Sequence, residues 1–287
     1  MSATIPNTRV RRAPAGLPAK TARALSNGRL VARRNFLTLT RVPTVFIFEL
    51  VQPIMFVLLF RFIYANNIAN LPPGLNYVEF LMPGIFVQNA IFGATTTAVG
   101  LAEDMKKGII DRFRSLPMAR SAVLLGRATS DLTKNVILVA IVLVIGYLVG
   151  FRFQNGLGNA LLMFMLVLAV GFTFSWMFAC IGLALKQVEA VQAASFVSIF
   201  PIVFISSAFV PVVGMAPFMQ VIARHNPVTY WCNLARYLAI GPRGITDLTT
   251  NLPVDTFHSL LLKSVLWIAG LLIVFVPLAI RLYRRLT

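Results

Sequence analysis

The run Leu161–Leu185, LLMFMLVLAVGFTFSWMFACIGLAL, contains 25 consecutive residues without a charged side chain. A helix rises about 1.5 Å per residue, so about 20 such residues cross a hydrocarbon layer of about 30 Å. This run is therefore long enough to form a transmembrane helix. The whole chain is 58% hydrophobic with a mean hydropathy of +0.80, which exceeds the composition of soluble domains. Lipid is the predicted solvent.

Five further apolar blocks complete an expected set of six spans, which predicts an all-α polytopic membrane protein. The expected spans are Val45–Tyr64, Phe80–Leu101, Asn135–Phe151, Leu161–Leu185, Val191–Val213 and Leu260–Ile280. The third is the weakest because Lys134 limits its apolar run, and an inner extension toward Arg127 would give it enough length. Pro53, Pro83 and Pro201 lie inside spans, where we expect ordinary helix kinks.

The formal net charge of +17 is unevenly distributed. Nine cations precede the first apolar block, and no acidic residue occurs before Glu49. This pattern is typical of a cytoplasmic flank under the positive-inside rule. It does not favour nucleic-acid binding, because no aromatic platform or groove-reading helix accompanies the basic residues. The nine are Arg9, Arg11, Arg12, Lys20, Arg23, Arg29, Arg33, Arg34 and Arg41.

Residues 1–22 lack apolar periodicity and predict a disordered, basic cytoplasmic leader. From 23 to 41 the pattern predicts a helix lying in the membrane interface, and residues 23–287 are expected to form one transmembrane domain. The run Arg33–Leu37 resembles a twin-arginine export signal. The apolar stretch that follows is longer than a signal segment of about 7–15 residues, and no A-x-A cleavage site follows it, so we interpret it as a retained span.

Loop cations predict the orientation. The 66–78 connection has none, the 103–127 connection has six, and Arg281, Arg284 and Arg285 follow the last span. Both termini are therefore predicted to be cytoplasmic, in a bacterial inner membrane. The long 214–257 connection would then face outward, although it carries Arg224, Arg236 and Arg243. The six cations of the cytoplasmic connection are Lys106, Lys107, Arg112, Arg114, Arg120 and Arg127.

The cytoplasmic connection after the second expected span, residues 103–117 (EDMKKGIIDRFRSLP), predicts a short amphipathic helix. Its apolar residues recur on one side, and Pro117 should end the helix near Leu116. A helix this short is marginal in water, so its apolar side must be covered either by lipid or by a cytoplasmic partner. The apolar residues are Met105, Ile109, Phe113 and Leu116.

The same connection resembles a motif between the second and third helices of ABC-2 type permeases, especially those of the daunorubicin-resistance type. The motif residues are Glu103, Gly108, Asp111 and Pro117, followed by Met118-Ala119-Arg120 and Gly126-Arg127. Further agreement comes from Arg33-Arg34-Asn35-Phe36, Gly150-Phe151-Arg152-Phe153 and Asn226-Pro227. The resemblance covers about residues 23–285. It implies the six-helix, type V exporter-like fold and a coupling helix at 103–116 that docks on an ATPase subunit.

The resemblance also implies roles for the residues of this connection. Those expected to enter the ATPase cleft are Met105, Ile109, Phe113 and Leu116. Those expected to set orientation through charge pairs are Lys107, Asp111, Arg112 and Arg114. Gly108 would permit close backbone approach, Pro117 would fix the exit, and Glu103 and Arg120 complete the set. The external residues 214–240 resemble a re-entrant helical pair, and an interfacial pair on the outer leaflet is the alternative.

ATP hydrolysis is expected in a separate chain. No lysine follows a glycine anywhere, so the phosphate-binding pattern G-x-x-x-x-G-K-[ST] is absent. We therefore expect no cofactor on this chain, and ATP with Mg²⁺ on two copies of a partner ABC ATPase subunit. Two copies of this chain, or this chain with a similar permease, would form a central cleft in contact with membrane lipids. The expected mechanism is alternating access.

Aromatic residues in the spans are candidates for the substrate path, suited to an amphipathic drug or lipid. They are Phe86, Phe92, Phe196, Phe200 and Phe204, for each of which helix packing is the alternative role. Glu49 either lines this path or neutralises Arg41 or Arg34 at the inner surface. The substrate itself is not predicted by the sequence.

Three rival functions have less support in the sequence. An ion-driven secondary transporter would need buried charge pairs at mid-membrane, for which only Glu49 is suitable. A membrane-bound lipid-modifying enzyme would need clustered acids or histidines, whereas the nine acids are scattered and His225 and His258 lie outside or at the edge of spans. A non-transporting scaffold is the third. Cys180 and Cys232 support neither a disulfide framework nor a metal site.

Overall fold

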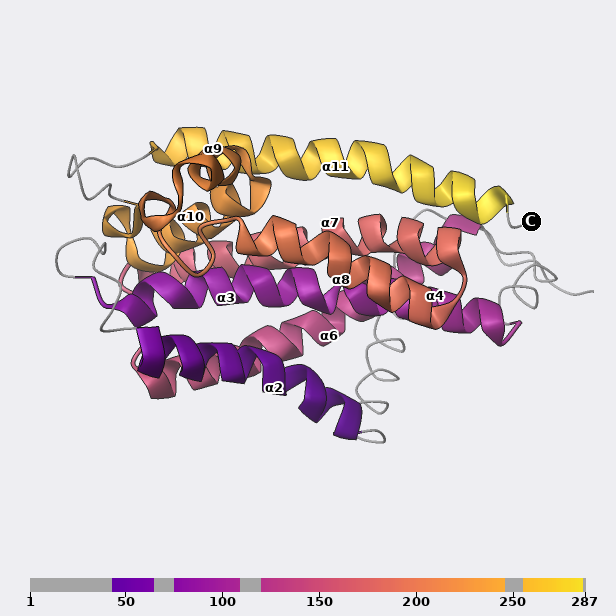
Figure 1. Ribbon diagram of the computed structural model, residues 1–287, viewed down its shortest axis with the longest axis horizontal. Coiled ribbons are helices and arrows are strands. Elements are labelled where there is room, and N and C mark those ends of the chain that lie inside the picture. The colour runs from indigo at the N-terminus through magenta and orange to yellow at the C-terminus, as the bar shows by residue number, and fades with distance from the viewer. Residues whose placement is uncertain (1–42, 65–74, 109–119, 246–254, 286–287) are drawn as a thin grey trace, which may run out of the picture. The chain divides into compact units, whose positions relative to one another are not determined.

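The computed structural model describes residues 43–64, 75–108, 120–245 and 255–285, with side chains from residues 50–63, 75–108, 131–245 and 255–285. Within these ranges the chain forms helices and short turns, and no β-strand occurs there. Figure 1 shows the long helices running side by side. The described part of the chain therefore has the all-α architecture that the sequence predicts.

Six long helical stretches follow one another in the described part of the chain. They are α2 (Pro43–Leu59) continuing into the π-helix η1 (Phe60–Tyr64), α3 (Tyr77–Gly93) continuing into α4 (Thr95–Lys106), α6 (Arg120–Val149), α7 (Gly156–Leu185), α8 (Val188–Phe204) and α11 (Phe257–Arg285). Four shorter elements lie between α8 and α11. They are η2 (Val212–Gly214), α9 (Pro217–His225), α10 (Pro227–Ile240) and η3 (Pro242–Ile245).

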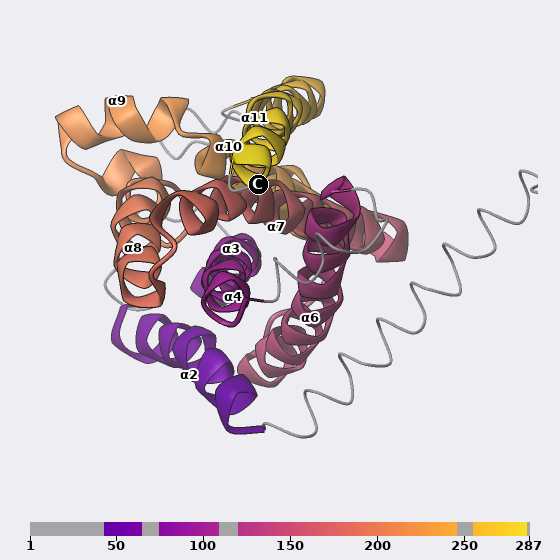
Figure 2. The same cartoon turned by 90° about the vertical axis from the view of Figure 1, so that its right-hand side faces the viewer.

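The stretch formed by α3 and α4 is the centre of the arrangement. Figure 2 shows α2, α6, α7 and α8 around it, with α11 outside α7. In the most apolar window of Tyr77–Lys106, 78% of the residues are buried, against 6% in that of α11. The chain itself therefore covers the central helix, whereas it leaves most of the apolar window of α11 exposed.

Four helices in the described part of the chain are long and apolar enough to cross a membrane. They are Tyr77–Lys106, Asp131–Val149, Gly156–Leu185 and Phe257–Arg285. Two shorter apolar helices, Leu50–Ile63 and Val188–Phe204, lie at the positions of the first and fifth expected spans. The count of six spans stays a prediction, because Val188–Phe204 is shorter than a typical span and the described side chains of the first helix begin only at Leu50.

The fifth helix ends earlier than the expected range Val191–Val213. Helix α8 stops at Phe204, and residues 205–210 form turns that we call the 205–210 segment. Pro201 in the last turn lacks a backbone donor, which weakens the helix there. Asn226 then donates side-chain hydrogen bonds to the carbonyls of Ile202 and Ile205, each at 2.6 Å. This distant side chain satisfies the helix end, so the helix need not continue.

Two glycines allow the central helix to touch its neighbours through backbone atoms. A Cβ at Gly182 of α7 would lie 2.6 Å from the Ala98 carbonyl oxygen of α4. A Cβ at Gly84 of α3 would lie 2.0 Å from the Ala208 carbonyl oxygen of the 205–210 segment. No side chain fits at such distances, so glycine is required at both crossings.

Candidate functional site

The described part of the cytoplasmic connection corrects where the expected coupling helix begins. Residues Glu103 to Lys106 are the last turn of α4, not the start of a separate helix at 103. Nothing between Leu101 and Lys106 interrupts the spanning helix, and the break comes at Gly108. An ion pair joins Lys107 to Glu103 at 3.1 Å between exposed side chains, which contributes at most about 0.5 kcal/mol.

The rest of the expected coupling surface lies outside the described residues. This applies to Ile109, Asp111, Arg112, Phe113, Arg114, Leu116 and Pro117. Arg120 begins α6 by its backbone, and its side chain is not described. The docking roles of these residues therefore stay predictions.

Gly108 is required for a turn rather than for close approach to another described residue. Its φ of 65° is in the left-handed region that glycine adopts without steric cost. No described atom lies within 4 Å of a Cβ built at this position. The glycine thus changes the chain direction just after α4, where the remainder of the connection begins.

A second connection meets the end of α4 at the predicted cytoplasmic end. A cavity of about 340 Å³ lies between Met105 and Lys106 of α4 and residues 186–189, which join α7 to α8. Lys186 has a φ of 61°, rare for a residue with a side chain. The ends of α4 and α7 and the start of α8 therefore share one surface, which the sequence did not reveal.

Four of the five expected path phenylalanines lie together. The ring of Phe92 lies 6.3 Å from that of Phe196 and 6.1 Å from that of Phe200, and Phe200 stacks on Phe204 at 5.0 Å. Phe196, Phe200 and Phe204 are 49%, 44% and 38% exposed. The α8 rings therefore form a half-exposed apolar surface beside the central helix.

The ring contacts continue onto residues that the sequence analysis missed. Phe209 of the 205–210 segment lies 5.1 Å from Phe204, 5.3 Å from Phe56 and 4.9 Å from Phe60, as ring-centroid distances. We call the whole set the aromatic stripe, comprising Phe56, Phe60, Phe92, Phe196, Phe200, Phe204 and Phe209. The aromatic stripe could have been recognised in the sequence from the spacing of about four residues between its rings, along α2 into η1 and along α8.

Two expected path residues are not part of this stripe. Phe86 is fully buried, with its ring 6.0 Å from that of Phe151 and 6.4 Å from that of Phe164. It packs among core residues on a different face of α3 because its position is not in the same helical register as Phe92. Glu49 lies in α2 by its backbone, and its side chain is outside the described set.

A row of polar side chains on α10 contacts the end of α8. The row consists of Asn226, Thr229, Asn233 and Arg236, spaced by three, four and three residues, and we call it the α10 polar stripe. Asn226 binds the α8 carbonyls described above and also accepts from the Val228 amide at 2.9 Å, which caps α10. The Ser207 amide donates to Thr229 Oγ1 at 3.2 Å. The stripe therefore satisfies backbone groups that the end of α8 leaves open.

Arg236 is the largest buried polar residue of this stripe. Its Nε donates to the Phe80 carbonyl oxygen of α3 at 2.8 Å. Its Nη1 donates to Ser207 Oγ at 3.0 Å and to Asn233 Oδ1 at 2.9 Å. Its Nη2 donates to the carbonyl oxygens of Ser207 and Ala208, the latter at 3.2 Å. Each of the five guanidinium N–H groups thus has an acceptor.

The acceptors of Arg236 are all neutral oxygens. Among these contacts, no carboxylate pairs with the buried cation. The guanidinium also lies over the Phe80 ring, with its central carbon 3.6 Å from the ring centroid. The sequence analysis counted Arg236 only as a loop cation, although its polar neighbours at helical spacing were a usable signal.

The chain matches the family model "ABC-2 type transporter" over residues 27–240. This chain belongs to the ABC-2 type transporter family. It is 30% identical over 252 residues to the daunorubicin resistance ABC transporter permease protein DrrB1 of Streptomyces coeruleorubidus, covering 88% of this chain and 84% of that protein. It is 26% identical over 264 residues to the probable doxorubicin resistance ABC transporter permease protein DrrC of Mycobacterium tuberculosis, covering 91% and 87%.

A third relative has a name that does not mention drug resistance. The putative transport permease ycf38 of Cyanophora paradoxa is 28% identical over 216 residues, covering 73% of this chain and 72% of that protein. The motif-based recognition of an ABC-2 permease is therefore confirmed. ABC-2 permeases of drug-resistance transporters work with ABC ATPase subunits and are generally non-catalytic.

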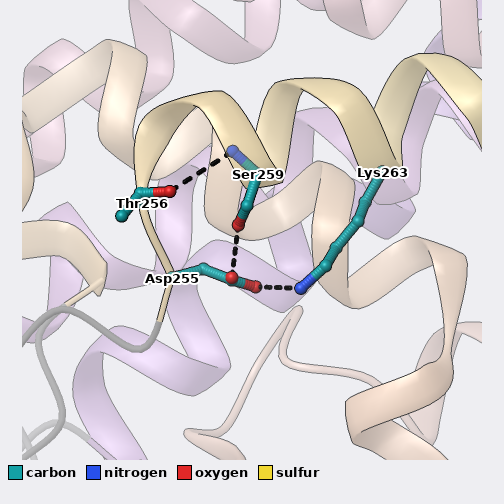
Figure 3. A network of polar contacts seen from close by, with 4 residues as sticks. All are labelled: Asp255, Thr256, Ser259 and Lys263. Carbon is teal, nitrogen blue, oxygen red and sulfur yellow. Dashed lines mark hydrogen bonds and ion pairs between the residues drawn. The ribbon is translucent and has the colours of Figure 1, made fainter.

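The family-model match, residues 27–240, includes the whole α10 polar stripe but ends before α11. Figure 3 shows a polar network at the start of α11. Lys263 Nζ lies 2.7 Å from Asp255 Oδ2, Ser259 Oγ donates to the same carboxylate, and the Ser259 amide donates to Thr256 Oγ1 at 3.4 Å. Lys263 falls inside the sixth expected span, and Asp255 neutralises it there. The sequence analysis missed this pair.

A buried polar contact also links α4 and α6 inside this permease. Thr97 Oγ1 donates to a carboxylate oxygen of Asp131, and both side chains are buried. Asp131 therefore acts here as a hydrogen-bond acceptor between two helices.

In the described part of the chain, no group of three or more His, Cys, Asp or Glu residues could hold a metal ion. Cys180 and Cys232 are buried free thiols.

Proposed function

We propose that this ABC-2 permease exports an amphipathic drug or lipid from the cytoplasm or the inner leaflet by alternating access, driven by a separate ATPase subunit. The aromatic stripe is the observation that carries this proposal. Its α8 rings are half-exposed beside the central helix, and aromatic faces bind apolar and planar groups by burying large areas. Relatives named for daunorubicin and doxorubicin resistance support a cargo of this kind.

The exposed side of the aromatic stripe supports assembly with a second permease. The half-exposed rings of α8, Phe196, Phe200 and Phe204, leave apolar surface that a second copy or a similar permease would cover, enclosing a cleft. Two ATPase subunits would bind ATP and Mg²⁺ and close on each other. Their movement would re-aim the cleft outward, with no cofactor bound by this chain.

The continuity of α4 with the cytoplasmic connection supports the coupling role proposed for residues 103–116. Because Glu103 to Lys106 are the last turn of α4, displacement of the residues that follow would act directly on the central helix. That helix touches α7 through Gly182 and the 205–210 segment through Gly84. A push at the predicted cytoplasmic end would therefore reach the predicted external end through backbone contacts.

The proposed setting is a bacterial inner membrane with both termini in the cytoplasm. Residues 214–240 would then face outward with two different helices. Helix α9 exposes Phe218, Val221 and Ile222 and suits the outer interface, whereas most of α10 is buried, as a re-entrant helix would be.

The test is reconstitution with a candidate ABC ATPase subunit as the partner. ATP hydrolysis and export of a fluorescent amphipathic drug would be measured in proteoliposomes. Phe113→Glu should abolish export while membrane insertion is normal, because a charge cannot enter an apolar cleft. Ser115→Glu, in the same connection, is the matched control and should retain export. Normal coupled export by Phe113→Glu, or export without the ATPase, would contradict the proposal.

A further inference from the structure

The 205–210 segment lies between two contacts of different kinds. On one side it meets the α10 polar stripe and α3, and on the other side it meets the rings of α2. Backbone that is neither helix nor sheet must have its polar groups satisfied by protein at membrane depth. The α10 polar stripe supplies these partners, and Arg236 alone binds the carbonyls of Ser207 and Ala208.

Backbone-directed contacts tie three elements together at this place. Arg236 of α10 binds the Phe80 carbonyl oxygen of α3 and the segment's carbonyls at once. The Ala208 carbonyl oxygen also presses against Gly84 of α3, where a Cβ would lie only 2.0 Å away. In addition, Tyr77 Oη of α3 donates to the Phe209 carbonyl oxygen at 2.9 Å. A shift of any one element would break hydrogen bonds to a buried cation.

The contact between the 205–210 segment and the first helix, formed by α2 and η1, consists of stacked aromatic rings. The Phe209 ring stacks on Phe60 with an interplanar angle of 7° and on Phe56 with an angle of 21°. Stacked rings slide or separate without leaving a buried polar group unpaired. Of the two contacts, this ring contact is therefore the one that can open at low cost.

We propose that Arg236 is a positioning residue that joins α10, the 205–210 segment and the outer turns of α3 into one rigid body, and that the predicted external end opens where Phe209 meets α2. The rigid body follows from the contacts alone, whereas the opening rests on the proposed export function. The two parts can therefore be tested separately.

The native thiols test the rigid body. Cys232 lies one helical turn before Arg236 on α10 and is fully buried, whereas Cys180 is buried on α7 and reports general unfolding. N-ethylmaleimide labelling of each thiol would be followed by mass spectrometry in Arg236→Lys and Arg236→Gln, with the exposed Arg243→Gln as the control. We expect Cys232 to label about tenfold faster in both Arg236 variants, as the loss of one charged hydrogen bond implies, with Cys180 unchanged.

Two results would overturn this part of the proposal. Equal acceleration at Cys180 would show general destabilisation in place of a local joint. Unchanged labelling of Cys232 in Arg236→Gln would show that Arg236 does not hold α10. Because labelling needs neither cargo nor ATPase, its outcome is separable from a failure of the proposed function.

Disulfide trapping tests where the external end opens. Phe60→Cys with Phe209→Cys would cross-link the ring contact, and Ser207→Cys with Thr229→Cys would cross-link the rigid body internally. Both pairs would be made with Cys180→Ala and Cys232→Ala, and the yield of each disulfide under one oxidising treatment would be compared with and without the ATP-bound partner ATPase. We expect ATP binding to lower the yield of the first pair only, because that contact opens. A lower yield in the second pair, or an unchanged yield in the first, would overturn the proposal.

Discussion

Replacing Arg236 with methionine removes all five donors of a buried guanidinium while keeping an unbranched side chain. The substitution removes the hydrogen bonds that Arg236 donates to the carbonyl oxygens of Phe80, Ser207 and Ala208. Ser207 Oγ loses its donor as well, whereas Asn233 Oδ1 loses the bond from Arg236 but still accepts from Ser207 Oγ at 3.0 Å. The buried charge disappears with its desolvation cost, but the desolvated acceptors remain.

The loss of stability can be bracketed from two scales. A hydrogen bond contributes a net of about 1 kcal/mol in soluble proteins and about 0.6 kcal/mol on average in helical membrane proteins. Because five hydrogen bonds are lost, we expect Arg236→Met to destabilise the permease by about 3–5 kcal/mol. For a chain of this size the midpoint of thermal unfolding should fall by about 6–15 °C. Arg236→Lys keeps the charge and three donors, so its loss should be smaller.

The assay is thermal unfolding of the purified protein in detergent, followed by a thiol-reactive dye that reads the exposure of Cys180 and Cys232. Arg243→Met is the matched control, because Arg243 is exposed and its replacement should change stability by less than about 0.5 kcal/mol. A midpoint for Arg236→Met within about 2 °C of the parent, or equal shifts in both variants, would refute the reasoning.

Three further outcomes follow from the packing. Gly84→Ala places a methyl group on the Ala208 carbonyl and should destabilise the protein by about 1–3 kcal/mol. Gly158→Ala, which has open space around it, should stabilise the protein by about 0.5–1 kcal/mol. Thermal unfolding that ranks the two variants the other way would contradict this packing. Phe200→Ala should lower the apparent affinity for the cargo that stimulates ATP hydrolysis by about tenfold, because a ring contact is lost. Phe218→Ala on α9 removes an equally apolar ring and should leave this affinity unchanged. Equal effects of the two variants would show that the aromatic stripe is not part of the cargo path. Asp255→Asn should lower stability by about 1 kcal/mol or less, because the ion pair is partly exposed, and a larger shift in thermal unfolding would show that Lys263 is more strongly desolvated than its exposure indicates.

The sequence predicted the features that depend on neighbours along the chain. Apolar length marked the ranges in which the long helices occur, because crossing a membrane is a property of about 20 consecutive residues. The spacing of Gly108, Asp111 and Pro117 identified the family, since a short motif needs no knowledge of the fold. Where the local signal was ambiguous, the expected boundaries were less accurate, as at Glu103, which belongs to α4.

Only the tertiary structure decided the features that join distant residues. Helix α8 stops at Phe204 because Asn226 caps it from more than 20 residues further along the chain. Arg236 binds the carbonyl oxygen of Phe80, which is 156 positions away. A backbone carbonyl is the same whatever residue carries it, so no residue type in the sequence marks it as a partner. The same reasoning applies to the separation of Phe86 from Phe92, since helical rotation alone does not say which face meets the core.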